Sequence, residues 1–428
     1  MDKLIIEGGS PLFGEALVSG AKNAALPLMA ASILSDEPLK LDNIPKLGDL
    51  ITMGRLLDYM GGKVTLYPQI DGQLHEQAHL DMSSLKLPEA PHELVKTMRA
   101  SALVLGPLLA RHGRARVSLP GGCAIGVRPI DLHLKALSQM GATFDLSQGD
   151  VIARAPVGGL KGAKINFETV TVTGTENVMM AAVLAKGRTI ISNAAREPEV
   201  TDTAKALISM GAKIKGLETD ELIIEGTEYL SGANHTVMPD RVEAATLIIA
   251  CALAGGRCSI VGAPVGALAA VIDKLIDSGV NISILGQTIT IESSQEPLKA
   301  VNVTTSPYPG FPTDAQAQFM ALMTVARGAS IITETIFENR FMHVSELRRL
   351  GADIALEGRS AVVNGVLKLS AAPLTASDLR ASASLILAAL VARGQSVVHR
   401  VYHLDRGYDR LDEKLRRLGA KIERVKDR

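Results

Sequence analysis

One short pattern occurs six times along the chain: an amphipathic helix, then a glycine, then a strand of alternating polarity. The copies begin with MGGKV at Met60, MGATF at Met140, MGAKI at Met210, SGVNI at Ser278, LGADI at Leu350 and LGAKI at Leu418. A regular period of about 70 residues indicates repeated structural units. Each glycine is expected to end its helix in a left-handed conformation before the strand begins; these are Gly61, Gly141, Gly211, Gly279, Gly351 and Gly419.

A second element recurs in the same register, an alanine-rich helix followed by a strand. Its copies start near Ala25, Ala100, Asn177, Ala244, Gln316 and Ala381. These helices are apolar on nearly every side, so we expect them to be buried. Six units with one exposed and one buried helix each predict an α/β protein. Because 428 residues are too many for one ordinary core, the simplest arrangement is two domains of three units.

Charge and composition exclude several classes of function. Lys and Arg together number 45, as do Asp and Glu, which argues against a nucleic-acid or anionic-membrane surface. The start, MDKLIIEGG, does not resemble a signal peptide, and the apolar runs are too short to cross a bilayer. Three cysteines fit a reducing cytosol, so we expect a cytoplasmic protein. Of these, Cys251 and Cys258 should be core residues.

Polar residues stand at the start of every buried helix. They are Ser19, Lys22 and Asn23; Lys96, Thr97 and Arg99; Thr173, Thr175 and Asn177; Asp240 and Arg241; Thr313 and Asp314; and Ser377, Asp378 and Arg380. Helix capping accounts for many of them: Thr313 with Gln316 fits a capping box, and Asp378 fits an N-cap. Capping does not account for the cations, because the helix dipole disfavours them there. Helix starts that carry cations predict an anion site, if they face a common cleft.

The stretch SLPGGCAIGVRPIDLH from Ser118 places Cys123 on a glycine-rich segment. Glycine and proline break regular structure, so we expect an exposed loop. The charge of Arg128 would stabilise the Cys123 thiolate and lower the pKa of the thiol, which makes it more reactive. The alternative is a structural cysteine in a surface turn. Arg340 and Arg406 also fall on expected loops, where a solvated arginine or a surface ion pair is the simpler interpretation.

Together these motifs resemble the UDP-N-acetylglucosamine enolpyruvyl transferases (1-carboxyvinyltransferases), a family of the enolpyruvyl transferases. The resemblance rests on SGAKNAALP from Ser19, KTMRAS from Lys96, PGGCAIGVRPIDLH from Pro120, NAAREPE from Asn193, FPTDAQAQF from Phe311, ENRFMH from Glu338, SDLRASASL from Ser377 and YHLDRGYDRLDEKL from Tyr402. It implies a two-domain fold of six βαβαββ units, three per domain around a pseudo-threefold axis. Residues 22–238 would form one domain and residues 1–21 plus 239–428 the other, with the active site in the cleft between them.

The resemblance also implies a reaction. The enolpyruvyl group of phosphoenolpyruvate would move to the 3′-hydroxyl of UDP-N-acetylglucosamine with release of phosphate. This is the first committed step of peptidoglycan synthesis, and so serves cell wall growth, cell shape and cell division. Cys123, the residue that fosfomycin would alkylate, and Asp314 would be the catalytic residues.

Binding roles follow from the same resemblance. The phosphoenolpyruvate ligands would be Lys22, Asn23, Arg128 and Arg406, with Arg99, Arg340, Arg380 and Asp378 supporting an anionic-ligand cleft. The UDP-N-acetylglucosamine contacts would be Asn23, Arg99, Arg128, Pro129, Ile130, Asp131, Leu132, His133, Thr171, Val172, Thr173, Asp314 and Ile336. His133 could otherwise be a capped or surface histidine.

Two alternatives stay open. A transferase like 5-enolpyruvylshikimate-3-phosphate (EPSP) synthase shares the fold and chemistry, although PGGC and SGAKN count against it. A paralogue that binds a nucleotide sugar without catalysis is the other. The sequence has no metal-ligand cluster, Walker loop or dinucleotide fingerprint, so no metal and no cofactor are implied, and the expected partners are the two small substrates.

Overall fold

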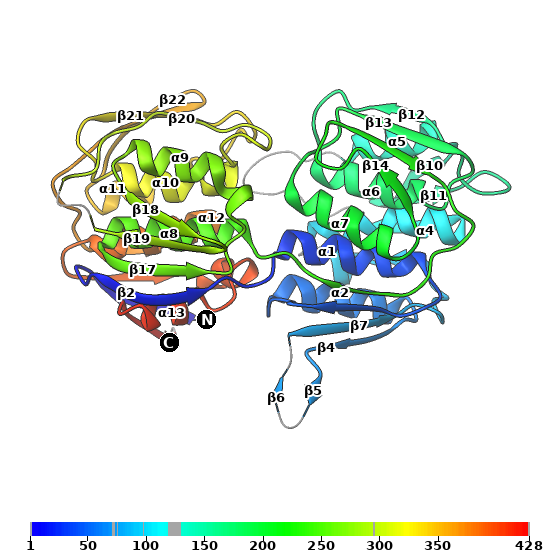
Figure 1. Ribbon diagram of the computed structural model, residues 1–428, viewed down its shortest axis with the longest axis horizontal. Coiled ribbons are helices and arrows are strands. Elements are labelled where there is room, and N and C mark those ends of the chain that lie inside the picture. Colours follow the sequence, from blue (N-terminus) through cyan, green and yellow to red (C-terminus); the bar gives the residue numbers. More distant parts are fainter. Residues whose placement is uncertain are drawn as a thin grey trace. The chain divides into compact units, whose positions relative to one another are not determined.

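The computed structural model describes residues 2–70, 73–74, 76–96, 98–118, 130–293 and 296–426. Within these ranges the chain forms two compact units (Figure 1). The terminal unit comprises residues 2–19 and 239–426, and the inserted unit comprises residues 20–118 and 130–238. Each unit has its own hydrophobic core, built largely from Ala, Val, Ile, Leu and Met. Cys123 and Arg128 lie outside the described residues.

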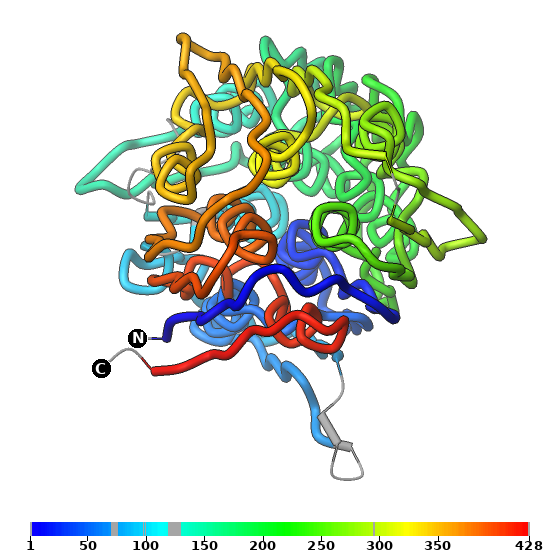
Figure 2. The backbone as a smooth tube through the Cα atoms, turned by 90° about the vertical axis from the view of Figure 1, so that its left-hand side faces the viewer, coloured from blue at the N-terminus to red at the C-terminus, as the bar shows by residue number. Residues whose placement is uncertain are grey.

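The terminal unit contains three four-stranded sheets. The first is β24 (Pro373–Thr375), β25 (Gln395–His399), β1 (Asp2–Glu7) and β26 (Lys421–Lys426); the second is β18 (Asn281–Leu285), β19 (Thr288–Glu292), β17 (Gly256–Val261) and β2 (Leu12–Leu17); the third is β20 (Val303–Thr304), β21 (Ala329–Thr333), β23 (Ser360–Asn364) and β22 (Asp353–Glu357). Figure 2 shows β1 (blue) beside β26 (red), so the two ends of the described chain share one sheet.

The helices of the terminal unit fall into two sets. The central helices are α8 (Arg241–Ala254), α10 (Gln316–Met323) and α12 (Leu379–Val391); the outer ones are α9 (Ala269–Asp277), α11 (His343–Arg349) and α13 (Leu411–Arg417); the short 3-10 turns are η3 (Val265–Leu268), η4 (Thr313–Ala315) and η5 (Val401–Arg406). Nearly every residue of α8, α10 and α12 is buried, which confirms the buried helices expected from their composition. Cys251 on α8 and Cys258 on β17 are core residues, as expected.

The inserted unit repeats this arrangement. Its sheets are β16 (Ala233–Thr236), β3 (Leu39–Asp42), β7 (Gln77–Asp81) and β4 (Lys63–Leu66); β10 (Thr143–Ser147), β11 (Asp150–Arg154), β9 (Arg114–Ser118) and β8 (Glu89–Ala90); β12 (Lys164–Asn166), β13 (Arg188–Ser192), β15 (Glu221–Glu225) and β14 (Lys213–Lys215); β5 (Gln69–Ile70) and β6 (Gln73–Leu74) form a separate hairpin. Its helices are α1 (Lys22–Ala31), α2 (Gly48–Tyr59), α3 (His92–Val95), α4 (Leu105–His112), α5 (Asp131–Gln139), α6 (Val172–Ala182) and α7 (Pro198–Ser209), with 3-10 turns η1 (Ser32–Leu34) and η2 (Arg99–Val104).

The same strand pairing recurs in all six four-stranded sheets. Each has one parallel pair at an edge and two antiparallel pairs, as in β20 with β21 and then β21 with β23 and β23 with β22. The six glycines of the repeat all have positive φ, between 90° and 105°, a backbone conformation that residues with a Cβ rarely adopt. The α/β class and the repeated βα units predicted from the sequence are therefore confirmed. Among the described helices, none is long and apolar enough to span a bilayer.

Candidate active site

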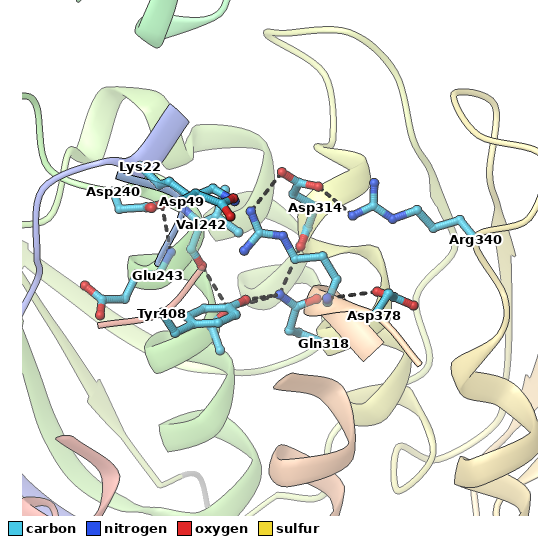
Figure 3. A network of polar contacts seen from close by, with 12 residues as sticks. Lys22, Asp49, Asp240, Val242, Glu243, Asp314, Gln318, Arg340, Asp378 and Tyr408 are labelled. Atoms are coloured by element: carbon cyan, nitrogen blue, oxygen red, sulfur yellow. Dashed lines mark hydrogen bonds and ion pairs between the residues drawn. The ribbon is translucent and has the colours of Figure 1, made fainter. Parts of the chain in front are cut away.

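Asp314 lies in η4, directly before the central helix α10, and two buried arginines hold its carboxylate (Figure 3). Arg340 Nη2 donates to Oδ1 at 2.6 Å, and Arg380 Nη2 donates to Oδ2 at 3.0 Å. Burial alone would raise the pKa of Asp314, but the charges and hydrogen bonds of Arg380 and Arg340 hold it well below its usual range. Asp314 is therefore ionised at neutral pH, and its side chain is still 27% exposed.

The two arginines keep donors to spare. Arg340 and Arg380 are 5% and 4% exposed, and Arg340 Nη1, Arg380 Nε and Arg380 Nη1 have no acceptor among the described residues. Buried polar atoms almost always have partners, so three buried guanidinium nitrogens without acceptors need an explanation. An anionic ligand beside Asp314 would supply the missing acceptors. The anion-binding role that the resemblance implied for both arginines stays a prediction.

A network of neutral side chains supports Arg380 and Asp314 from the core side (Figure 3). The Gln318 amide nitrogen donates to the Asp314 carbonyl at 2.9 Å and approaches the Tyr408 hydroxyl at 3.0 Å. The Thr246 hydroxyl donates to the Val242 carbonyl at 2.8 Å, so it must accept the Tyr408 proton, at 2.9 Å. The Tyr408 ring lies 5.3 Å from the Arg380 guanidinium carbon. This network joins the starts of α8, α10 and α12.

Sequence reasoning missed Gln318, Tyr408 and Thr246. Two of these residues could have been found from the sequence by their spacing, because Gln318 lies one helical turn after Asp314 and Tyr408 lies two residues after Arg406. Arg406 itself is an exposed residue at the end of η5, so the buried Tyr408 anchors the segment that carries it. Polar side chains in an otherwise apolar helix are good candidates for such support, because burying them without partners is costly.

The capping predictions had mixed outcomes. Asp378 is the N-cap of α12 and accepts hydrogen bonds from the backbone amides of Arg380 and Ala381, as predicted. The capping box predicted for Thr313 and Gln316 is wrong. The Thr313 hydroxyl instead donates to Glu334 Oε2 at 2.7 Å, and neither polar atom of the Gln316 side chain has a partner within the described residues. In a capping box the Gln316 backbone amide would donate to the Thr313 hydroxyl, but it donates to the Thr313 carbonyl instead, within the 3-10 turn η4.

In the inserted unit, Lys22 opens α1 and its Nζ lies 3.3 Å from Asp49 Oδ2. Both side chains are mostly buried, at 12% and 11% exposed, so the cation expected at this helix start has a nearby counter-charge. Asn23 is the next residue of α1 and is exposed. Arg99 opens η2, but its side chain lies outside the described part of the structure, as do all atoms of Pro129.

The remaining residues of the expected nucleotide segment surround the start of α5. Ile130 precedes the helix, and Asp131, Leu132 and His133 form its first turn. The His133 ring is buried, so the surface histidine considered from the sequence is wrong. Asn177 Nδ2 contacts His133 Nδ1 at 3.0 Å, and Thr173 Oγ1 contacts His133 Nε2 at 3.3 Å. Burial lowers the pKa of His133 to about 4.

The orientation of the Asn177 amide determines which ring nitrogen of His133 carries the proton. Its Oδ1 accepts from the Gly106 amide at 2.5 Å and its Nδ2 donates to the Ala102 carbonyl at 2.7 Å, which fixes the orientation of the amide. Nδ1 of His133 must therefore accept, and Nε2 carries the proton and points to Thr173. Thr171 is the N-cap of α6, where its hydroxyl accepts from the Gly174 amide at 3.2 Å, and Val172 is the first residue of that helix.

Comparison with known proteins identifies the class to which this fold belongs. The model of the EPSP synthase (3-phosphoshikimate 1-carboxyvinyltransferase) family matches residues 6–415, and the chain belongs to this family of enolpyruvyl transferases. The enolpyruvyl transferase NikO from Streptomyces tendae is similar over 100% of this chain and 99% of its own, with 26% identity and a TM-score of 0.89.

Two structures of EPSP synthase from Acinetobacter baumannii are also similar over the full length of both chains. Their sequence identity is 19%, with TM-scores of 0.75 and 0.76. At that identity the likeness supports the fold alone. Family membership therefore does not identify the acceptor substrate of this chain.

Proposed function

We propose that the protein transfers the enolpyruvyl group of phosphoenolpyruvate to the 3′-hydroxyl of UDP-N-acetylglucosamine and releases phosphate. The observation that carries the enolpyruvyl chemistry is the ionised Asp314 beside three buried guanidinium nitrogens that have no acceptor among the described residues. The choice of acceptor rests on the loop sequence PGGC at Cys123 and on SGAKN at Lys22, which resemble the transferases that use this nucleotide sugar. Both substrates are soluble anions, in keeping with the proposed cytoplasmic reaction.

The proposed chemistry is an addition followed by an elimination. In the addition, C3 of phosphoenolpyruvate gains a proton, the sugar oxygen loses one, and a bond forms between that oxygen and C2. In the elimination, C3 loses a proton and the bond between C2 and the phosphate oxygen breaks. We assign the proton donor for C3 to Cys123 and the base near the sugar hydroxyl to Asp314. Both steps redistribute negative charge, which fixed cations stabilise.

Asp314 is a weak base while both arginines hold it, because they lower its pKa. An anion bound to the spare nitrogens of Arg340 and Arg380 would compete for their charge and raise the pKa of Asp314. Substrate binding would then make this carboxylate a better proton acceptor. We propose Lys22, Asn23, Arg128 and Arg406 as the phosphoenolpyruvate ligands, and Arg99 and Asp378 as supporting groups.

The nucleotide sugar would contact Asn23, Arg99, residues 128–133, residues 171–173, Asp314 and Ile336. His133 already uses both ring nitrogens for Asn177 and Thr173, so we expect this residue to contact a nucleotide through its main chain. The alternative activity is enolpyruvyl transfer to shikimate 3-phosphate, because family membership supports it equally. A paralogue that binds a nucleotide sugar without catalysing a reaction is the third possibility.

Phosphate release from phosphoenolpyruvate distinguishes these possibilities. The protein is incubated with phosphoenolpyruvate alone, with UDP-N-acetylglucosamine, and with shikimate 3-phosphate. We expect rapid release only with the nucleotide sugar. Release only with shikimate 3-phosphate would establish the alternative activity, and no release with either acceptor would contradict the proposal.

Substitutions at Cys123 test its assigned role separately. Cys123→Asp keeps a titratable acid and should retain measurable turnover while becoming insensitive to fosfomycin, whereas Cys123→Ala should lose turnover. Cys251 and Cys258 serve as internal controls, because both are buried and should not react with the drug in the folded protein. Mass spectrometry of the treated protein locates the adduct. An adduct on another residue, or an active alanine variant, would contradict the assignment.

A further inference from the structure

Glu334 follows β21 and is 1% exposed, and no role was predicted for it from the sequence. Its carboxylate accepts four hydrogen bonds. Oε1 accepts from the Thr305 hydroxyl at 2.9 Å and from the backbone amides of Ile336 and Phe337 at 2.8 and 3.1 Å. Oε2 accepts from the Thr313 hydroxyl at 2.7 Å. Four donors compensate the burial of one negative charge, so the carboxylate has a defined position.

These contacts are part of a closed ring that includes Asp314 and Arg340. Glu334 binds Thr313, the residue before Asp314, and Asp314 binds Arg340. The Arg340 guanidinium carbon lies 5.2 Å from the centre of the Phe337 ring, and the Phe337 amide returns to Glu334. One carboxylate therefore fixes both the turn that carries Asp314 and the loop that carries Ile336 and Arg340.

The backbone of Glu334 is fixed as well. Its amide donates to the Arg359 carbonyl at 2.8 Å, and its carbonyl accepts from Arg359 Nε at 2.9 Å. Next to it, the Thr335 amide donates to the Thr305 hydroxyl at 2.9 Å. Hydrogen bonds to Arg359 thus fix the backbone of Glu334, and its side chain in turn fixes the turn that carries Asp314 and the loop that carries Ile336 and Arg340. A side chain needed only to fill the core would not require oxygen atoms that accept four hydrogen bonds.

We propose that Glu334 is a positioning residue for the acceptor substrate. It sets the distance between Asp314 and the Ile336 main chain, and the acceptor hydroxyl is recognised between these two groups. This inference rests on the proposed function, which places both residues at the acceptor. Small displacements of such groups cost large factors in rate or binding, whereas none of the four donors to Glu334 in the described part of the chain is a proposed phosphoenolpyruvate ligand.

Two variants test the proposal. Glu334→Asp keeps the charge but is one methylene shorter, so it cannot reach Thr313 and the Ile336 and Phe337 amides together. We expect the KM for the acceptor to rise about tenfold or more, with the KM for phosphoenolpyruvate within about threefold of wild type. Glu334→Gln keeps one carbonyl oxygen for the amides, and its NH₂ can donate to Thr313 Oγ1, so both constants should stay within about threefold. Glu357→Asp, at the exposed end of β22, is the matched control.

Hydrogen exchange provides a readout that does not depend on activity. In Glu334→Asp the amides of residues 335–337 should exchange faster, while exchange in β21, β22 and β23 stays unchanged. Unchanged exchange at residues 335–337, or equal rises in both KM values, would overturn the proposal. Faster exchange throughout the sheet would overturn it too, because Glu334 would then be a general stability residue.

The two proposals fail in different ways. If the wild-type protein turns over shikimate 3-phosphate in place of the nucleotide sugar, the proposed function fails, and the same KM comparison is made with that acceptor. If the wild-type protein turns over neither acceptor, the exchange result still decides whether Glu334 holds the two loops.

Discussion

Asp314 combines two properties that usually oppose each other. It is partly open to solvent, yet two buried arginines stabilise its ionised form. A carboxylate in this state is ready to accept a proton only when another negative charge competes for the arginines. At the residue scale, the pKa of Asp314 is therefore set by its two arginines, and an anion bound to them would raise it.

The first prediction concerns that balance. Asp314→Asn keeps the shape of the side chain but removes the proton acceptor, so we expect turnover to fall by about 10²-fold or more. Nucleotide-sugar binding, measured by calorimetry, should stay within a few fold. Removing the charge also leaves Arg340 and Arg380 buried without their counter-ion, so the melting temperature should fall. Asp277→Asn, on the exposed end of α9, is the control. Near-normal turnover of Asp314→Asn would contradict the assigned role.

At the scale of elements, His133 joins two helices of the inserted unit. It lies in the first turn of α5 and contacts Asn177 and Thr173 of α6. Its pKa is about 4 in the folded protein, against an ordinary value of 6.5. Between these values the unfolded chain binds a proton that the folded protein does not. Stability is therefore lost as the pH falls from 6.5 towards 4.

The second prediction follows from this sign. Between pH 7 and pH 5, His133 should account for roughly 2 kcal/mol of lost unfolding free energy. His133→Asn should remove that part of the pH dependence, whereas His92→Asn, on the exposed face of α3, should leave it unchanged. Urea unfolding at both pH values measures the difference. The same pH dependence in His133→Asn and in the wild type would contradict the assignment.

The elements themselves could largely be predicted from the sequence, because their signals are local. A glycine with positive φ ends each outer helix, and apolar residues on all sides mark each central helix. The partners of β2 and β3 could not be predicted, since they pair with β17 and β16, more than 190 residues away in the chain. The role of Glu334 could not be predicted for the same reason, because it accepts a hydrogen bond from Thr313, 21 residues away in the chain.

At the scale of the whole molecule, one repeated unit carries different chemistry in different copies. Helix starts in the terminal unit carry Asp314 and Arg380, whereas α1 in the inserted unit carries Lys22 with Asp49 beside it. The repeated fold supplies the positions, and we propose that the side chains at those positions determine the reaction. Family membership therefore establishes an enolpyruvyl transferase fold, while our proposal for the acceptor rests on a few residues at the helix starts and on the Cys123 segment.

Following the label of ¹³C phosphoenolpyruvate by NMR tests the central claim most directly. The labelled substrate is supplied with UDP-N-acetylglucosamine and shikimate 3-phosphate together, so that the protein must choose. We predict that the label appears as a vinyl ether on the 3′-oxygen of the nucleotide sugar, with one phosphate released per product formed. A label on the shikimate ring, or a label that stays in phosphoenolpyruvate, would contradict the account.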